Sequence, residues 1–115
     1  MISVTIHHDE NRHVSAFEFS GHAGYDETGK DLVCAGASTI AIGTVNAIYA
    51  LLHIEPKIDQ ATEGGGYLRV DLPTDIDVEA DAKLQLIVQV MTAQVYSMVQ
   101  TYGQYIKINY NQVAQ

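Results

Sequence analysis

Hydrophobic and polar residues alternate in two short runs near the start of the chain. One run covers residues 2–7 and the other covers residues 14–20, where Phe17 and Phe19 share a face. A period of two is typical of a half-buried strand. Because polar turn residues separate the two runs, we predict two antiparallel strands joined as a hairpin.

Two longer stretches carry apolar residues at three- and four-residue spacing, the period of an amphipathic helix. The first starts at Cys34 and ends before Pro56, and the second covers residues 84–102, where Gly103 is placed to end it. Between them, residues 57–62 and 67–72 flank a glycine-rich segment and predict a second hairpin. We interpret that segment as a plain turn, because the Lys-Ser/Thr pair of a phosphate-binding loop is missing.

A last alternating run, residues 105–110, completes the order β-β-α-β-β-α-β. The simplest layered arrangement for this order is an α+β fold with two helices packed on one face of a mixed or antiparallel sheet. The length of 115 residues suits one domain, so we predict a single domain over residues 1–115. A domain this small leaves part of its surface uncovered, which favours a homodimer.

The segment between the first hairpin and the first helix follows neither period. It runs from Gly21 to Asp31 and contains Gly21, Gly24 and Gly29 together with acidic residues. Glycine-rich segments without periodicity are typical of loops. We predict a flexible loop that could open and close as a flap.

Charge and composition limit the classes of partner. The chain has 6 basic and 14 acidic residues, a net charge of −8. This sign is wrong for neutralising phosphates, so we expect no direct nucleic-acid partner, whereas a basic peptide or protein would be attracted. The apolar runs are shorter than a membrane span requires and the first residues do not resemble a secretion signal. We therefore expect a cytoplasmic protein with no membrane partner.

The single cysteine, Cys34, is the first candidate for chemistry. It lies where the loop ends and the predicted helix begins, and the partial positive charge of a helix N-terminus favours the thiolate, which is the nucleophilic form. The free amides of the first helical turn could bind an oxyanion beside the sulfur. His22, at the other end of the loop, could act as the base if loop closure brings its imidazole to Cys34.

Other interpretations remain open on these residues alone. Cys34 could be an inert core residue and His22 a surface histidine. A redox sensor would need a resolving cysteine that the chain does not have. A non-catalytic module that binds a basic protein tail is also compatible with the charge. We expect no metal and no cofactor, because five possible ligands lack metal-binding spacing: His7, His8, His13, His22 and Cys34. We expect His7, His8 and His13, near the first turn, to be exposed to solvent.

Two neighbouring motifs resemble a known family. The sequence reads GHA at residues 21–23 and GKDLVCAGAS at residues 29–38. This pattern resembles the signature of the ribosomal-processing cysteine protease family (Prp). The resemblance implies that His22 and Cys34 form a catalytic dyad, that Asp31 and Ser38 support the site, and that the fold is a small α+β homodimer.

The resemblance also implies a substrate. Proteases of this family are expected to remove a short N-terminal extension from large ribosomal subunit protein twenty-seven, cutting after a pair of phenylalanines. A ribosomal protein with a basic tail would suit the net charge of −8. The alternative to this function is a non-catalytic, ribosome-associated binding module.

Overall fold

The computed structural model describes residues 1–27, 30–61 and 65–112. Two strands, a helix, two more strands, a second helix and a last strand follow one another in the described residues. They are β1 (Ile2–His8), β2 (Val14–Ser20), α1 (Leu32–Leu52), β3 (Lys57–Gln60), β4 (Tyr67–Asp71), α2 (Val78–Tyr102) and β5 (Ile106–Gln112). This confirms the predicted order of elements.

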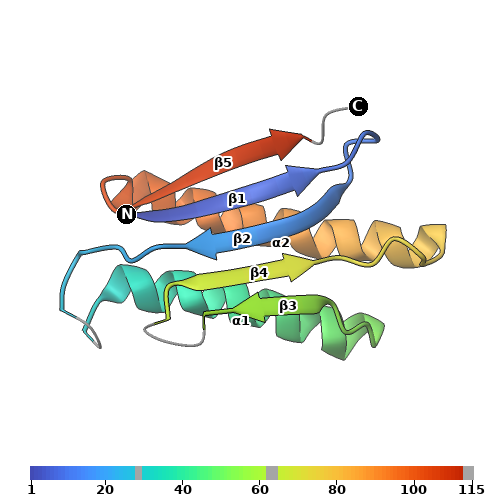
Figure 1. Ribbon diagram of the computed structural model, residues 1–115, viewed down its shortest axis with the longest axis horizontal. Helices are drawn as coiled ribbons and strands as arrows, with labels where there is room; N and C mark the ends of the chain where they lie inside the picture. Colours follow the sequence, from blue (N-terminus) through green and yellow to red (C-terminus); the bar gives the residue numbers. More distant parts are fainter. Residues whose placement is uncertain (28–29, 62–64, 113–115) are drawn as a thin grey trace.

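All five strands form one sheet in the order β3-β4-β2-β1-β5. β1 pairs with β2 and β4 pairs with β3 in antiparallel hairpins, but β1 and β5 run parallel, so the sheet is mixed. Both helices lie on the same face of the sheet, α1 behind β3 and β4 and α2 behind the other strands (Figure 1). The predicted α+β arrangement is therefore confirmed, in its mixed form.

Alternation along the strands separates a buried face from an open one. In β1 the side chains of Ile2, Val4 and Ile6 are buried under the helices. The β1–β2 register pairs Ile6 with Phe17, and both are almost fully buried in the same hydrophobic core. The side chains of Ser3, Thr5 and His7 alternate with them and face the side of the sheet without helices.

Both helices begin earlier than their apolar stripes predict. α1 starts at Leu32, and α2 starts at Val78, six residues before Leu84. Most residues in the first turns of α2 are exposed, and the side chain of the N-cap residue Asp77 accepts a hydrogen bond from the N–H of Ala80 at 2.7 Å. Local capping rather than burial therefore stabilises this end of the helix.

α1 is also long and apolar enough, by length and composition, to cross a membrane. It has 21 residues with a mean hydropathy of 1.5 in its most apolar window. The core helix of a globular fold passes the same test, and α1 packs Val33, Ala41 and Ile48 into the hydrophobic core. The expectation of no membrane partner stays a prediction.

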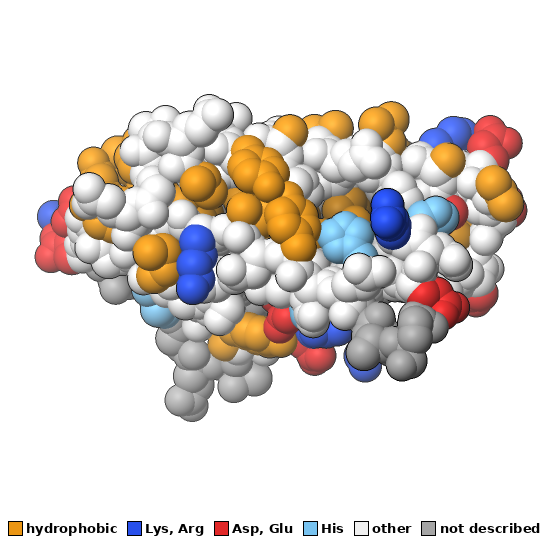
Figure 2. Space-filling view, turned by 90° about the horizontal axis from the view of Figure 1, so that it is seen from above, with side chains coloured by type: hydrophobic (Ala, Val, Ile, Leu, Met, Phe, Trp, Pro, Cys, Tyr) orange, Lys and Arg blue, Asp and Glu red, His pale blue; other side chains and the backbone are white. Residues whose placement is uncertain are grey.

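The β5 edge of the sheet has an apolar surface. Figure 2 looks onto this edge and shows hydrophobic side chains gathered along its middle. Tyr96 of α2 and Tyr110 of β5 are both exposed there, and their hydroxyl groups are 2.6 Å apart. Burial, and then the hydrogen bond with Tyr96, raise the pKa of Tyr110 to about 12. This edge is one surface that the predicted homodimer could use, and the homodimer stays a prediction.

The expectation that His7 is exposed to solvent is wrong. Only 15% of its side chain is exposed, because β1 extends through His8 and places His7 on the open face between neighbouring strands. Nε2 of His7 is hydrogen-bonded to Glu18, and Nδ1 lies 3.0 Å from the side-chain amide of Asn111. His7 therefore belongs to a polar network that crosses three strands.

We expect Glu18→Gln to make the stability of the fold less dependent on pH in the acid range. The hydrogen bond with His7 lowers the pKa of Glu18 below its ordinary value of 4.5, against the opposing effect of burial. The hydrogen bond from Tyr67 and the charge of Arg69 lower it further. A carboxylate with a lowered pKa stabilises the folded state above its unfolded pKa and loses this contribution as the pH falls through the folded pKa.

The melting temperature of the wild type should therefore exceed that of Glu18→Gln at neutral pH, and the difference should shrink as the pH falls below 4.5. Glu10→Gln, at an exposed position before β2, is the control and should show no such convergence. A difference between wild type and Glu18→Gln that stays constant with pH would contradict this prediction.

Candidate active site

Cys34 lies in the first turn of α1, as predicted. Its backbone N–H donates to Oδ1 of the N-cap residue Asp31 at 2.9 Å. Its half-buried sulfur accepts a hydrogen bond from the backbone N–H of Ala23 at 3.4 Å. The helix N-terminus and the Ala23 amide both place partial positive charge beside the sulfur.

Asp31 connects the helix to the loop that precedes it. While Oδ1 caps α1, Oδ2 accepts hydrogen bonds from the backbone N–H groups of Tyr25 at 2.9 Å and Asp26 at 3.1 Å. Burial of this residue, of which 7% is exposed, would raise the pKa of Asp31, but backbone hydrogen bonds, that of Cys34 first, lower it below its ordinary value. Asp31 is therefore a charged group that holds the loop against the first turn of α1.

These bonds revise the predicted oxyanion site. The N–H of Cys34 is taken by the Asp31 side chain, and the N–H of Ala35 donates to the Asp31 carbonyl at 3.0 Å. The sequence pattern predicts N–H groups without an acceptor in the first turn. In the structure, Asp31 accepts the hydrogen bonds of both of these N–H groups. The Ala23 N–H, by contrast, already points at the sulfur.

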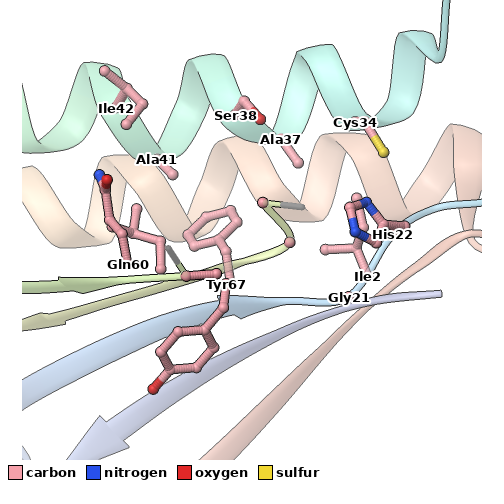
Figure 3. A pocket seen from close by; sticks show the side chains of 15 residues that line it. Ile2, Gly21, His22, Cys34, Ala37, Ser38, Ala41, Ile42, Gln60 and Tyr67 are labelled. Atoms are coloured by element: carbon pink, nitrogen blue, oxygen red, sulfur yellow. The ribbon is translucent and has the colours of Figure 1, made fainter. Parts of the chain in front are cut away.

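His22 and Cys34 line the same groove. Figure 3 shows the Cys34 side chain pointing from α1 toward the His22 ring, which extends from the segment just after β2. The two residues come from the two ends of the loop, and the hydrogen bond between Ala23 and the sulfur holds those ends together. The structure thus brings together the pair that the sequence suggested, with a pocket open beside it.

The groove has a volume of about 340 Å³ and runs between α1 and the β3–β4 hairpin. Its base is apolar, formed by Ile2, Phe19 and Leu68. Ser38 lines it one helical turn after Cys34, as the helical spacing predicts. The wall formed by α1 consists of Cys34, Ala37, Ser38, Ala41 and Ile42, and the opposite wall includes Gln60, Ala61 and Tyr67. A mostly apolar groove with Cys34 and His22 at one end suits binding of a peptide segment (Figure 3).

The loop is anchored at several points before residue 28. Gly21 and Gly24 adopt positive φ angles of 93° and 70°. Tyr25 packs edge-on against Tyr102 and Tyr105, with ring centroids 5.7 and 5.1 Å apart. Gly29 lies outside the described residues. Opening of the loop as a flap stays a prediction.

The sequence did not reveal the far wall of the groove. Residues near the second glycine-rich turn carry no motif, and their place opposite α1 depends on the pairing of β4 with β2. The capping role of Asp31 had a signal, because an aspartate directly before the first residues of a helix is a usual N-cap. Within residues 1–27, 30–61 and 65–112, no three His, Cys, Asp or Glu side chains are grouped so that they could hold a metal ion.

Comparison with known proteins identifies the family. The profile of the family described as Cysteine protease Prp matches residues 1–107. The chain is 35% identical over 111 residues to the Ribosomal processing cysteine protease Prp of Bacillus subtilis (strain 168), covering 96% of this chain and 98% of the relative.

Solved structures agree with the sequence comparison. The essential ribosomal processing protease Prp from S. aureus, in complex with a covalently linked product peptide, is similar with a TM-score of 0.84 and 34% identity. The S. aureus protease with a substrate peptide gives a TM-score of 0.79 and 32% identity. Both matches cover 96% of this chain and 100% of the other. The profile match and the identity over nearly the full length confirm the resemblance, and the chain belongs to the Prp family of cysteine proteases.

Proposed function

We propose that this protease removes the short N-terminal extension of large ribosomal subunit protein twenty-seven, using Cys34 as nucleophile and His22 as base. The observation that carries the proposal is the sulfur at the start of α1, held by the Ala23 N–H and facing His22 at one end of a peptide-sized groove. The names of the relatives, which are ribosomal processing proteases, support the choice of substrate.

The chemical steps follow from this arrangement. The Cys34 thiolate attacks the carbonyl carbon of the scissile peptide bond, and protonated His22 gives its proton to the leaving amine. A thioester then joins Cys34 to the N-terminal part of the substrate. His22 takes a proton from water, the hydroxide attacks the thioester, and the peptide acid leaves as the thiolate re-forms. The covalently linked product peptide in the S. aureus relative supports a covalent step.

The Ala23 N–H is the proposed oxyanion donor. It lies 3.4 Å from the sulfur, and the oxyanion of a tetrahedral intermediate forms on the carbon that is bonded to that sulfur. A donor that already points at the sulfur needs little reorganisation to bind the oxyanion. Asp31 is the positioning residue for this donor, because it holds the loop that carries Ala23 against the helix.

The groove suits an apolar segment followed by a basic tail. Its base is apolar and its α1 wall is mostly apolar, which fits a pair of phenylalanines at the cleavage site. The net charge of −8 attracts a basic chain outside the groove. Ser38 lies on the α1 wall, where its hydroxyl group can contact the substrate backbone.

Incubation with a peptide that spans the extended N-terminus tests the substrate. We expect one cut after the phenylalanine pair, seen as two product masses. A matched peptide with both phenylalanines replaced by alanine should be cut at least about tenfold more slowly, because each lost ring removes on the order of 2 kcal/mol of burial. An uncut peptide with folded wild-type protein would refute this substrate.

Alkylation by iodoacetamide distinguishes a catalytic Cys34–His22 dyad from a cysteine that only fills space in the core. Wild-type Cys34 should react at neutral pH faster than a free thiol, and His22→Ala should slow the reaction. Equal rates in the two proteins would favour a binding module that grips a basic tail, and would refute the dyad.

A further inference from the structure

Gly66, the residue before β4, lies directly against the His22 ring. A Cβ atom built on Gly66 would lie 2.5 Å from Nε2 of His22, 3.0 Å from Cε1 and 3.1 Å from Cδ2. Real Cβ atoms essentially never make contacts below 3.0 Å, so only glycine leaves room for the ring in this position. Because Nε2 is the closest ring atom, the imidazole points this nitrogen at the turn and keeps Nδ1 on the side away from it.

Gly66 also holds the backbone beside His22. The N–H of Gly21 donates to the carbonyl oxygen of Gly66 at 2.7 Å, next to the register pair of Ser20 and Tyr67. Gly66 therefore determines the position of the backbone at His22 and limits how far its ring can rotate toward β4. Rotation about the last side-chain bond of histidine is soft, so a close contact restricts the ring more than the bond does.

In this site, packing orients the histidine ring, whereas in a catalytic triad a polar residue orients it. There, a carboxylate or amide hydrogen-bonded to the histidine selects its tautomer and orientation. Here the carboxylate oxygens of Asp31 accept hydrogen bonds from the backbone N–H groups of Tyr25, Asp26 and Cys34 instead. In the part of the chain that the structure describes, the hydrogen bond of His22 is made by its backbone carbonyl and not by its ring.

We infer that Gly66 is a positioning residue for His22. Its missing side chain lets the imidazole rest against the β3–β4 turn, with Nδ1 on the side open to Cys34. This inference rests on the proposed Cys34–His22 dyad and adds a constraint from the opposite wall of the groove.

The test compares Gly66→Ala with Gly65→Ala. Both glycines have positive φ angles, 79° and 63°, so alanine strains the backbone at either position. A Cβ at residue 65 meets nothing within 4 Å, which makes Gly65→Ala a control for backbone strain without contact to the ring. Three quantities are measured for each variant and for His22→Ala: the pH profile of Cys34 alkylation by iodoacetamide, and kcat and KM for the substrate peptide.

We expect Gly66→Ala to reduce kcat and the alkylation rate near neutral pH by about tenfold or more, because small displacements of a catalytic group have large kinetic costs. Its alkylation profile should approach that of His22→Ala, whereas Gly65→Ala should keep the wild-type profile. Any effect of Gly65→Ala on peptide binding would show in KM. A purely structural role would lower the melting temperatures of the two glycine variants without separating their alkylation profiles.

The outcomes distinguish the inference from the proposed function. Equal alkylation profiles for the two glycine variants, with His22→Ala inactive, would overturn the role of Gly66 and leave the dyad intact. An active His22→Ala would overturn both. If Gly66→Ala does not fold, the double variant with His22→Ala should regain a cooperative melting transition, because the clashing ring is gone. A double variant that also fails to fold would refute the contact.

Discussion

Cys34→Ala should abolish peptide cleavage while the protein stays folded. We expect kcat/KM to fall by at least about 10³-fold, because removal of a covalent nucleophile leaves only binding and electrostatic contributions. The melting temperature should change by no more than a few degrees, because alanine at this half-buried first-turn position leaves little cavity. The measurements are product formation by mass spectrometry and thermal unfolding by circular dichroism.

Cys34→Ser is the matched control for this prediction. Serine keeps the size of the side chain and can accept the hydrogen bond from Ala23, but its hydroxyl group does not ionise as a thiol does. Both variants should therefore be inactive, and both should lose the single site of alkylation. A loss of cooperative unfolding in Cys34→Ala would show that the sulfur is structural and would contradict the prediction.

Asp31→Ala should reduce both stability and activity. The substitution removes the cap of α1 and leaves the backbone amides of Tyr25, Asp26 and Cys34 without their acceptor. The released loop carries Ala23 and the amide that points at the sulfur. We expect kcat to fall by about 10- to 100-fold, the usual scale for a displaced catalytic group.

Asp77→Ala is the control, because Asp77 caps α2 in the same way but holds no loop at the active site. Loss of that cap should cost about 1 kcal/mol of stability and leave cleavage unchanged. Asp31→Ala should lower the melting temperature more than Asp77→Ala does and should also slow cleavage. Equal losses of stability and normal cleavage in both variants would show that Asp31 is only a helix cap.

Periodicity predicted most of the fold because burial imposes it. Alternation in β1 and β2 and the three- and four-residue spacing in α1 follow directly from the need to cover one face of each element. Periodicity did not predict the start of α2, because the turns before Leu84 are mostly exposed and are stabilised by the Asp77 cap. The burial of His7 was not predicted either, because the residues that cover it belong to neighbouring strands.

The sequence by itself determined the order of the elements, the place of Cys34 at the start of a helix, and the pair of motifs that carries His22. These are local properties, set by side chains within a few residues of one another. Only the tertiary structure decided three other features. These are the backbone N–H groups that bind Asp31, the contact of Gly66 with the His22 ring, and the residues that form the wall of the groove opposite α1. The amides that Asp31 binds lie within six residues of it, but the path of the loop that brings them together follows no period. The other two features join residues far apart in the chain, so they depend on strand register, which local periodicity does not encode.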